Sequence, residues 1–316
     1  MTLILHLGAP KTATSTLQNT FFPRHPGLLF LGKEVDSKRA WTGWRTPEIG
    51  TLMLNLELKN LDFRPDRDRV SRMVDEIRAA AGKRPVVISS EDLCLFSALD
   101  SFGKLERIRD LFGTLGPIRL LLAVREQVSL LKSIYITEHR GEMLHLPRTK
   151  QSWYPSFDQY LDIHFRYGCG AVLESFRFAA MIERYESIFG RDNVFVYAFD
   201  EFRCDPIGTL RLLCRFIGVD EADPCLALTA ETRENQHHSS RGYAMTKLRQ
   251  RLTGGRSVSD LMPGPVKAAF RRWLRRGTPF DFAASPDAVR RIADYYRADN
   301  EALLSRRGIQ LQLSAN

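Results

Sequence analysis

The sequence LILHLGAPKTATSTL, residues 3–17, decides the fold of this chain. An apolar run of strand length ends at Gly8 and Pro10, and a cluster of threonine and serine then opens a helical pattern. The stretch therefore predicts a strand, a tight loop and a helix start, with Lys11 inside the loop. Backbone N–H groups and the helix dipole at such a start attract anions, and the hydroxyl groups and the lysine add donors and charge. A phosphate or sulfate group is the ligand that this loop predicts.

Strand-like and helical patterns alternate along the rest of the chain. Three further strand-like runs cover residues 85–90, 118–124 and 193–198. The helical patterns between them cover residues 67–81, 105–111, 128–140 and 176–188. This alternation predicts an α/β fold with a central, mainly parallel sheet flanked by helices. Ligands of such sheets gather at the carboxyl ends of the strands, which here are residues 8–16, residues 89–92 and the chain from Arg125 onward.

The order Pro-Lys-Thr-Ala-Thr-Ser-Thr resembles the 5′-phosphosulfate loop of sulfotransferases, Pro-Lys-x-Gly-Thr-Thr/Ser. These enzymes use 3′-phosphoadenosine-5′-phosphosulfate. The loop departs from the G-x-x-x-x-G-K-[ST] motif of nucleotide triphosphatases, because it has no Gly-Lys pair. The resemblance implies the sulfotransferase form of the fold of P-loop-containing nucleotide hydrolases. The residues that it implies for the 5′-phosphosulfate are Pro10, Lys11, Thr12, Ala13, Thr14, Ser15 and Thr16.

Two features of this loop leave an alternative open. Ala13 stands where the family commonly has glycine, and an alanine fits there only if its φ is negative. The loop is also compatible with an ordinary buried strand followed by a capped helix, in which Thr14 or Ser15 is the N-cap.

A second motif follows the strand at 118–124. Arg125 stands at the strand terminus, and Ser133 follows eight residues later on a predicted helix. The pair is similar to the sulfotransferase element that holds the 3′-phosphate of the donor. A guanidinium binds phosphate through two parallel hydrogen bonds, and a hydroxyl adds a donor. The alternative is that Arg125 pairs with an acidic neighbour and Ser133 belongs to an ordinary helix surface.

The middle one of these strand ends offers a base for catalysis. Glu91 and Asp92 follow the strand at 85–90, where an acceptor hydroxyl would lie beside the sulfuryl group. Sulfuryl transfer needs a base that takes the acceptor proton and a positive charge near the leaving phosphate oxygen. Glu91 is the preferred base and Lys11 the positive charge, while Asp92 is the better candidate for a helix cap. Glu34 is the alternative base, because glycan sulfotransferases have a similar Lys-Glu pair shortly after the first helix.

The resemblance continues in the same order to about residue 220. A tyrosine-led helix at 185–190 leads into the strand at 193–198, and an acidic loop at 199–206 precedes a helix that ends near Gly218. Bacterial-type sulfotransferases have similar elements. Arg233 and Asn235 follow where such chains return towards the donor, so the resemblance implies that either contacts a phosphate.

The basic charge of the chain is concentrated in residues 241–276. This segment holds ten Lys and Arg residues against Asp260 alone, so its formal charge equals the +9 of the whole chain. Prolines and glycines interrupt it before a predicted short helix at 266–275. The segment is expected to act as a mobile lid, as a docking surface for an acidic glycan or as a contact with anionic lipid; a solvated basic face is the alternative. Nucleic acid is not expected as a partner, because no recognition module is present.

Composition bounds the remaining expectations. The chain has 316 residues, 44% of them hydrophobic and 26% charged, which is typical of a globular protein; we expect one sulfotransferase domain over residues 1–316. No apolar run is long enough to span a membrane, and no secretory signal is visible. The five cysteines form no C-x-x-C pair, and no metal-binding motif is present. These features predict reduced thiols, a cytoplasmic location and chemistry without a metal.

The sequence as a whole therefore predicts a bacterial-type sulfotransferase. It would transfer a sulfuryl group from 3′-phosphoadenosine-5′-phosphosulfate to a hydroxyl or amine of a carbohydrate, a lipid or a small molecule. Two alternatives remain: a kinase-like enzyme that uses adenosine triphosphate, and a non-enzymatic protein that binds acidic glycans or membranes through residues 241–276.

Overall fold

The computed structural model describes residues 1–35, 41–57, 65–94, 103–138, 156–167, 172–231, 240–241, 244–245, 270, 273, 278 and 280–312. The chain divides into two compact units. Unit 1 consists of Met1–Arg125, Glu174–Glu234 and Ala298–Leu311. Unit 2 consists of Glu126–Leu173, Asn235–Arg297 and Gln312–Asn316.

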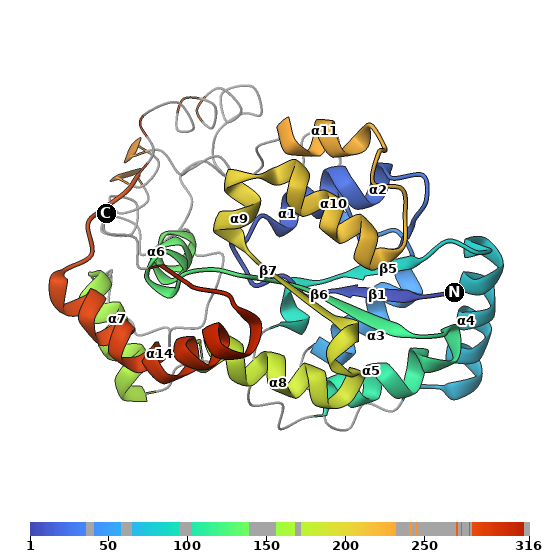
Figure 1. Ribbon diagram of the computed structural model, residues 1–316, viewed down its shortest axis with the longest axis horizontal. Coiled ribbons are helices and arrows are strands. Elements are labelled where there is room, and N and C mark those ends of the chain that lie inside the picture. The colour runs from blue at the N-terminus through green and yellow to red at the C-terminus, as the bar shows by residue number, and fades with distance from the viewer. Residues whose placement is uncertain are drawn as a thin grey trace. The chain divides into compact units, whose positions relative to one another are not determined.

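Unit 1 is built on a five-stranded sheet, in which every neighbouring pair of strands is parallel (Figure 1). The order of the strands is β2 (Leu29–Phe30), β5 (Val86–Ser89), β1 (Leu3–His6), β6 (Ile118–Val124) and β7 (Val194–Ala198). The predicted parallel α/β sheet is thus confirmed, and all four predicted strands belong to it. The chain turns from one side of β1 to the other after β5, so β1 lies at the topological switch point, where ligands of such sheets bind.

Helices cover both faces of this sheet. In Figure 1, α10 (Pro206–Ile217) lies on one face, while α5 (Lys104–Phe112) and α8 (Phe178–Phe189) lie on the other. Because both faces are covered, the strands are apolar almost throughout rather than alternating. The other helices of unit 1 are α3 (Pro47–Glu57), α4 (Arg67–Ala81), α9 (Phe199–Cys204) and α11 (Cys225–Glu231). Single turns of 3-10 helix are η2 (Glu91–Leu93), η3 (Gly113–Leu115), η5 (Glu174–Phe176) and η6 (Arg191–Asn193).

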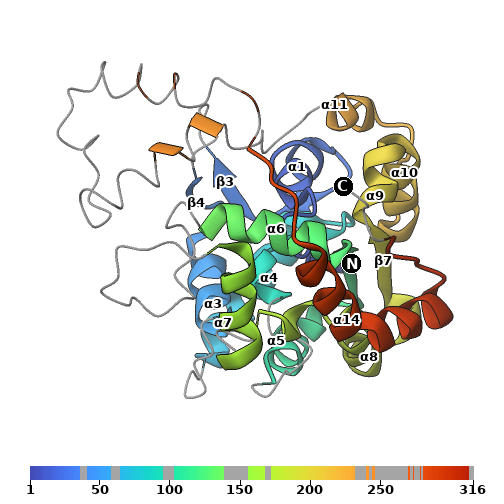
Figure 2. The same cartoon turned by 90° about the vertical axis from the view of Figure 1, so that its left-hand side faces the viewer.

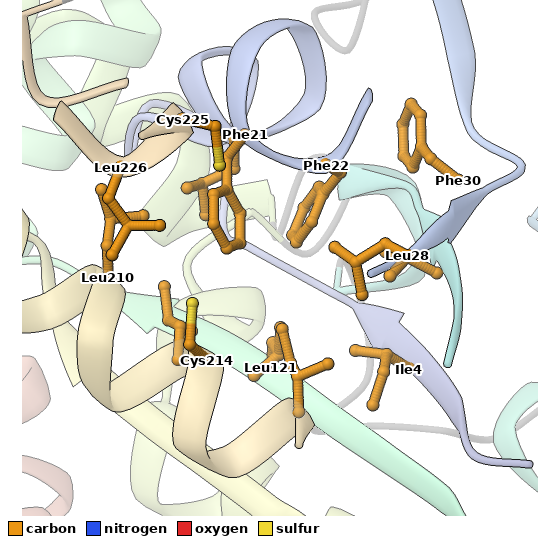
Figure 3. Close-up of a cluster of buried hydrophobic side chains, with 14 of the residues drawn as sticks. Ile4, Phe21, Phe22, Leu28, Phe30, Leu121, Leu210, Cys214, Cys225 and Leu226 are labelled. Carbon is orange, nitrogen blue, oxygen red and sulfur yellow. The ribbon is translucent and has the colours of Figure 1, made fainter. Parts of the chain in front are cut away.

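The helix after β1 is irregular. It starts as α1 (Thr14–Thr16), widens into the π-helical turn η1 (Leu17–Phe21) and ends as α2 (Phe22–Arg24), which contains Pro23. Phe21 and Phe22 of this helix belong to one buried cluster with Ile4 and Leu121 of the sheet and with Leu210 of α10 (Figure 3). This buried cluster fixes the helix, and therefore the loop that precedes it, at the carboxyl end of β1. A separate hairpin, β3 (Lys33–Val35) with β4 (Trp41–Trp44), follows and was not predicted.

Unit 2 contains α6 (Gln127–Glu138) and α7 (Phe157–Tyr167), which lie side by side (Figure 2). Its aromatic core has the ring of Tyr135 5.5 Å from Phe157 and 5.4 Å from Phe282. The long helix α14 (Pro286–Arg307) begins in unit 2 and ends in unit 1. The predicted helix at 266–275 falls almost entirely outside the described residues. Among the helices that the structure describes, none is both long and apolar enough to cross a membrane.

Candidate active site

The loop between β1 and α1 contains two non-glycine residues in the left-handed region of backbone conformation. The φ of Lys11 is 67° and the φ of Ala13 is 62°. Ala13 therefore does not meet the condition that an alanine fits this position only with a negative φ. A left-handed conformation costs an L-residue roughly 1–2 kcal/mol, because its Cβ approaches the following carbonyl oxygen. Strain of this kind concentrates at functional sites, where the surrounding structure holds it in place.

The helix that follows the loop, residues 14–24, is called the loop helix below, and its start is not capped by a side chain. Ala13 occupies the N-cap position and offers no hydrogen-bonding side chain, and no acidic residue lies in the first turn. The alternative interpretation, in which Thr14 or Ser15 is the N-cap, is wrong. Lys11, Ala13 and Ser15 are half-buried, whereas Pro10, Thr12, Thr14 and Thr16 are buried. An uncapped helix start beside a lysine favours an anion.

Two of the threonine hydroxyls bond within the protein. Thr12 Oγ1 donates to the carbonyl oxygen of Ala9 at 2.6 Å and so closes the loop on itself. Thr14 Oγ1 donates to Glu91 Oε1. Glu91 is the first residue of η2, directly after β5, so the structure brings this carboxylate to the loop helix. Its backbone supports the turn, since the N–H of Cys94 donates to the Glu91 carbonyl at 3.0 Å.

Arg125 also contacts the loop. Its Nη1 donates to the carbonyl oxygen of Lys11 at 2.7 Å, and its guanidinium carbon lies 4.7 Å from the ring centre of Phe199. The contact joins the end of β6 to the left-handed part of the loop. Lys11 and Arg125, chosen from different strand ends in the sequence, thus meet at one end of β1.

The second member of that predicted motif, Ser133, is half-buried on α6 in unit 2. Within unit 2, the buried carboxylate of Glu126 accepts hydrogen bonds from the N–H of Val128 at 2.6 Å and from the N–H of Ser129 at 2.8 Å. The start of α6 is therefore capped by an acidic side chain. The pairing of Arg125 with Ser133 at one phosphate stays a prediction.

Sequence analysis overlooked a buried polar group beneath the loop. His6 is the last residue of β1 and is 0% exposed. Burial lowers the pKa of its imidazole to about 3, so the ring is neutral at physiological pH. Its Nδ1 lies 2.6 Å from Ser89 Oγ, and the same oxygen accepts a hydrogen bond from Gln18 Nε2 at 2.9 Å. A histidine within an otherwise apolar strand, and a glutamine four residues after Thr14, were the available signals.

The remaining candidates lie partly or wholly outside the described residues. The backbone of Glu34 belongs to β3, where it pairs with Gly43, but its side chain is not among those described. Arg233 and Asn235 fall within the range 232–239, also outside the description. Of the basic segment, Arg241 lies 5.6 Å from the ring centre of the half-exposed Trp273. In the part of the chain that the structure describes, no group of three or more His, Cys, Asp or Glu side chains could hold a metal ion.

No model of a known protein family matches this sequence, and no curated protein matches it. Solved structures do match the fold. A sulfotransferase from Alicyclobacillus acidocaldarius aligns with a TM-score of 0.56 and 19% identity, covering 99% of this chain and 97% of that chain.

Two further sulfotransferase structures align with lower scores. The sulfotransferase domain of the Synechococcus PCC 7002 olefin synthase has a TM-score of 0.44 and 15% identity, covering 94% of each chain. Mouse sulfotransferase SULT7A1, solved in complex with PAP, has a TM-score of 0.42 and 14% identity, covering 95% of this chain and 84% of that chain. The chain has the sulfotransferase form of the P-loop-like α/β fold, as the loop at residues 10–16 predicts.

Proposed function

We propose that this chain is a sulfotransferase that uses 3′-phosphoadenosine-5′-phosphosulfate as its sulfuryl donor and a hydroxyl or amine as its acceptor. The observation that carries the proposal is the loop at residues 10–16. It stands at the carboxyl end of the central strand, contains the left-handed residues Lys11 and Ala13, and opens an uncapped helix. Backbone N–H groups, a lysine and a nearby guanidinium form a donor set suited to phosphate and sulfate oxygens.

In the proposed reaction, a glutamate acts as the base and Lys11 supplies the positive charge. The acceptor oxygen or nitrogen forms a bond to sulfur as the bond between sulfur and the 5′-phosphate oxygen breaks. Glu91 takes the acceptor proton, and Glu34 is the alternative base. Lys11 stabilises the negative charge that develops on the departing phosphate oxygen. The products are the sulfated acceptor and adenosine 3′,5′-bisphosphate, and no metal takes part.

The donor would be held by two groups of residues. Lys11 and the loop from Pro10 to Thr16 would hold the 5′-phosphosulfate. Arg125 and Ser133, together with Arg233 or Asn235, would hold the 3′-phosphate. The contact of Arg125 with the Lys11 carbonyl supports this division, because it places a guanidinium beside the loop.

Calorimetric titration with adenosine 3′,5′-bisphosphate, beside adenosine triphosphate and adenosine 5′-monophosphate, tests the proposal. We expect micromolar binding of the bisphosphate and much weaker binding of the monophosphate. Arg125→Ala should abolish this preference. Equal binding of bisphosphate and monophosphate would contradict the proposal, and a preference for the triphosphate would favour a kinase-like enzyme.

Arg119→Ala is a matched control for this titration. Arg119 belongs to β6, the strand that Arg125 follows. Its Nη1 donates to the carbonyl of Phe216 at 2.5 Å, and its guanidinium lies 5.5 Å from the ring centre of Phe216. It therefore makes the same two kinds of contact as Arg125, but away from the loop. Its loss should leave bisphosphate affinity unchanged.

For the acceptor, we propose an anionic molecule that docks on residues 241–276. In the described part of this segment, the half-exposed Trp273 stacks on Phe270 with ring centres 5.9 Å apart and is approached by Arg241. An exposed tryptophan that stacks on a neighbouring phenylalanine and is approached by an arginine suits an acidic glycan. The double variant Arg241→Ala/Trp273→Ala should elute from an immobilised acidic polysaccharide at lower salt than the parent chain. Unchanged elution, or binding to anionic lipid vesicles instead, would contradict this choice.

A further inference from the structure

Three buried polar side chains form a hydrogen-bonded chain directly beneath the loop. His6 ends β1, Ser89 ends β5, and Gln18 lies in η1 of the loop helix. The exposed fractions are 0% for His6, 0% for Ser89 and 7% for Gln18. His6 and Ser89 are partners in the strand register, so their side chains stand on the same face of the sheet. These hydrogen bonds therefore join the ends of β1 and β5 to the loop helix.

The contacts define where the protons of this chain lie. The Gln18 amide nitrogen donates to Ser89 Oγ, so the hydroxyl proton of Ser89 is left for His6 Nδ1, 2.6 Å away. If Nδ1 carried the proton instead, the Ser89 hydroxyl proton and His6 Nε2 would both lack a partner among the residues that the structure describes. With the proton on Nε2, only that N–H lacks a partner among the described residues. Buried polar groups pair wherever they can, which favours the neutral Nε2–H form.

The loop helix is held against β5 and its continuation at two successive turns. Thr14 and Gln18 are four residues apart and share one face of the helix. Thr14 bonds to Glu91, and Gln18 bonds to Ser89, two residues earlier along the same segment. One turn further, the ring of Phe22 lies edge-on to the His6 ring, with centres 5.1 Å apart. The helix face that carries the candidate base contact is thus the face that His6 and Ser89 anchor.

His6 also contacts the loop itself. A Cβ placed on Gly8 would lie 3.0 Å from His6 Nε2 and would clash with the methyl group of Thr14. Only a glycine therefore lets the backbone pass this close to the imidazole. The loop backbone therefore passes close to His6 at Gly8, while the hydrogen bonds of Ser89 and Gln18 hold the helix that follows.

We propose that His6, Ser89 and Gln18 form a positioning relay in which the neutral Nε2–H form of His6 fixes the loop helix for anion binding. The proposal rests on the sulfotransferase function proposed above and adds three positioning residues to it. A phenylalanine would fill the place of His6 and would remove the unpaired Nε2–H, but it would offer no acceptor to the buried Ser89 hydroxyl. The imidazole supplies an acceptor, Nδ1, which an apolar ring lacks. This acceptor directs the Ser89 O–H towards His6 and leaves the lone pairs of Ser89 Oγ for the N–H of Gln18.

Two substitutions of His6 separate this relay from simple packing. His6→Asn places an acceptor oxygen where Nδ1 stands but loses most of the ring, whereas His6→Phe keeps a ring and loses the acceptor. The relay predicts that adenosine 3′,5′-bisphosphate affinity, measured by calorimetry, falls about tenfold in His6→Phe and is largely retained in His6→Asn. A packing role predicts the reverse order, and that result would overturn the proposal.

A second pair of variants guards against a failure of either His6 variant to fold. Ser89→Ala removes both hydrogen bonds of the relay with the loss of one oxygen. Ser90→Ala is the matched control, because Ser90 is equally buried and its hydroxyl has no partner among the described residues. We expect about tenfold weaker bisphosphate binding for Ser89→Ala and no change for Ser90→Ala. Equal affinities of the two variants would overturn the proposal.

Nitrogen-15 NMR of the histidine side chains tests the relay without any ligand. We expect the His6 imidazole in the wild-type chain to show the Nε2–H form and to keep it as the pH is lowered through the range where exposed histidines titrate. A proton on Nδ1 would overturn the proposal. Because this measurement needs no nucleotide, it distinguishes failure of the relay from failure of the sulfotransferase assignment, which the wild-type titration reports.

Discussion

The loop helix and the helix α8 begin in opposite ways. The loop helix starts after the left-handed Ala13, which supplies no cap, and carries no acid in its first turn. α8 starts against Asp299 of α14, whose carboxylate accepts from the N–H of Ala179 at 3.0 Å and from the N–H of Ala180 at 3.1 Å. Both helices present the positive end of a dipole. One end is closed by a carboxylate from another part of the chain, whereas the other is left beside Lys11.

This difference separates a structural helix start from a functional one. A carboxylate cap satisfies the backbone N–H groups permanently, so the start of α8 contributes to stability and offers nothing to a ligand. The loop helix lacks such a cap and carries backbone strain at Lys11 and Ala13. Removal of the Lys11 charge should therefore lower activity and leave stability nearly unchanged, while removal of the α8 cap should do the opposite.

The largest effect is expected at Glu91. Glu91→Gln removes the proposed base while keeping an oxygen that accepts from Thr14 Oγ1, so kcat for sulfuryl transfer should fall roughly 10²–10⁴-fold. Bisphosphate affinity and the melting temperature should stay close to those of the wild type. Steady-state kinetics with the donor and calorimetry with the bisphosphate measure the two halves of this prediction. Full activity of the variant would transfer the role of base to Glu34.

The next effect concerns the positive charge of the loop. Lys11→Met keeps an unbranched side chain but removes the charge, so kcat should fall roughly 10²–10³-fold through loss of transition-state stabilisation. Asp205→Ala is the control at a closed helix start, since Asp205 caps α10 through the N–H of Gly208 at 2.9 Å. It should lower the free energy of unfolding by about 1 kcal/mol and leave kcat unchanged. Equal losses of kcat in both variants would contradict the distinction between the uncapped start of the loop helix and the helix starts capped by a carboxylate.

At α8 the expected effect is on stability. Asp299→Ala removes the acceptor for Ala179 and Ala180, and the free energy of unfolding should fall by about 1 kcal/mol, with no change in bisphosphate affinity. Denaturant titration of the wild type and the variant measures the difference. A loss of nucleotide affinity without a loss of stability would show that this helix start is not purely structural.

The contribution of Asp299 to the free energy of unfolding should change with pH in a defined direction. Burial raises the pKa of the Asp299 carboxyl above its ordinary value, although backbone donors act in the opposite direction. The folded chain then binds this proton more tightly than the unfolded chain does. Relative to Asp299→Asn, the wild type should therefore be most stable below the ordinary carboxyl pKa and lose stability as pH rises through the folded-state pKa. Unfolding both chains from about pH 4 to about pH 7 tests the slope, and a rising difference would contradict it.

The sequence contained enough information for most of the sheet and for part of the site. Periodicity and length located β1, β5, β6 and β7, because strands buried on both faces are nearly continuous apolar runs. The edge strand β2 has only two residues, too few for any pattern. Lys11, Glu91 and Arg125 could be predicted as site residues because each follows a strand. The carboxyl ends of parallel strands lie at the same edge of the sheet.

The contacts between these residues could not be predicted in the same way. The link from Thr14 to Glu91 spans 77 positions, and the link from Arg125 to the Lys11 carbonyl spans 114. Each depends on the twist of the sheet and on side-chain rotamers rather than on local pattern. The left-handed φ of Ala13 was also hidden, because an alanine gives no signal of a conformation that its own Cβ disfavours.

Ala13→Gly is expected to give the smallest effect. The sign of the change in the free energy of unfolding tests whether the left-handed Ala13 is strained. Glycine removes the roughly 1–2 kcal/mol cost of the left-handed alanine, but it also raises the entropy of the unfolded chain by about 0.4–1 kcal/mol. The variant should therefore be more stable by about 0.5–1 kcal/mol, as measured by denaturant titration.

Ala9→Gly is the internal control for this sign, because Ala9 lies in the same loop and is not among the residues with positive φ. There glycine relieves no strain and only gives the unfolded chain more freedom, so the free energy of unfolding should fall by up to about 1 kcal/mol. Two alanines four positions apart should thus respond to the same substitution with opposite signs. A loss of stability in both variants would mean that Ala13 does not hold its left-handed conformation in solution, and the loop would then differ from the capped helix starts only in its missing cap.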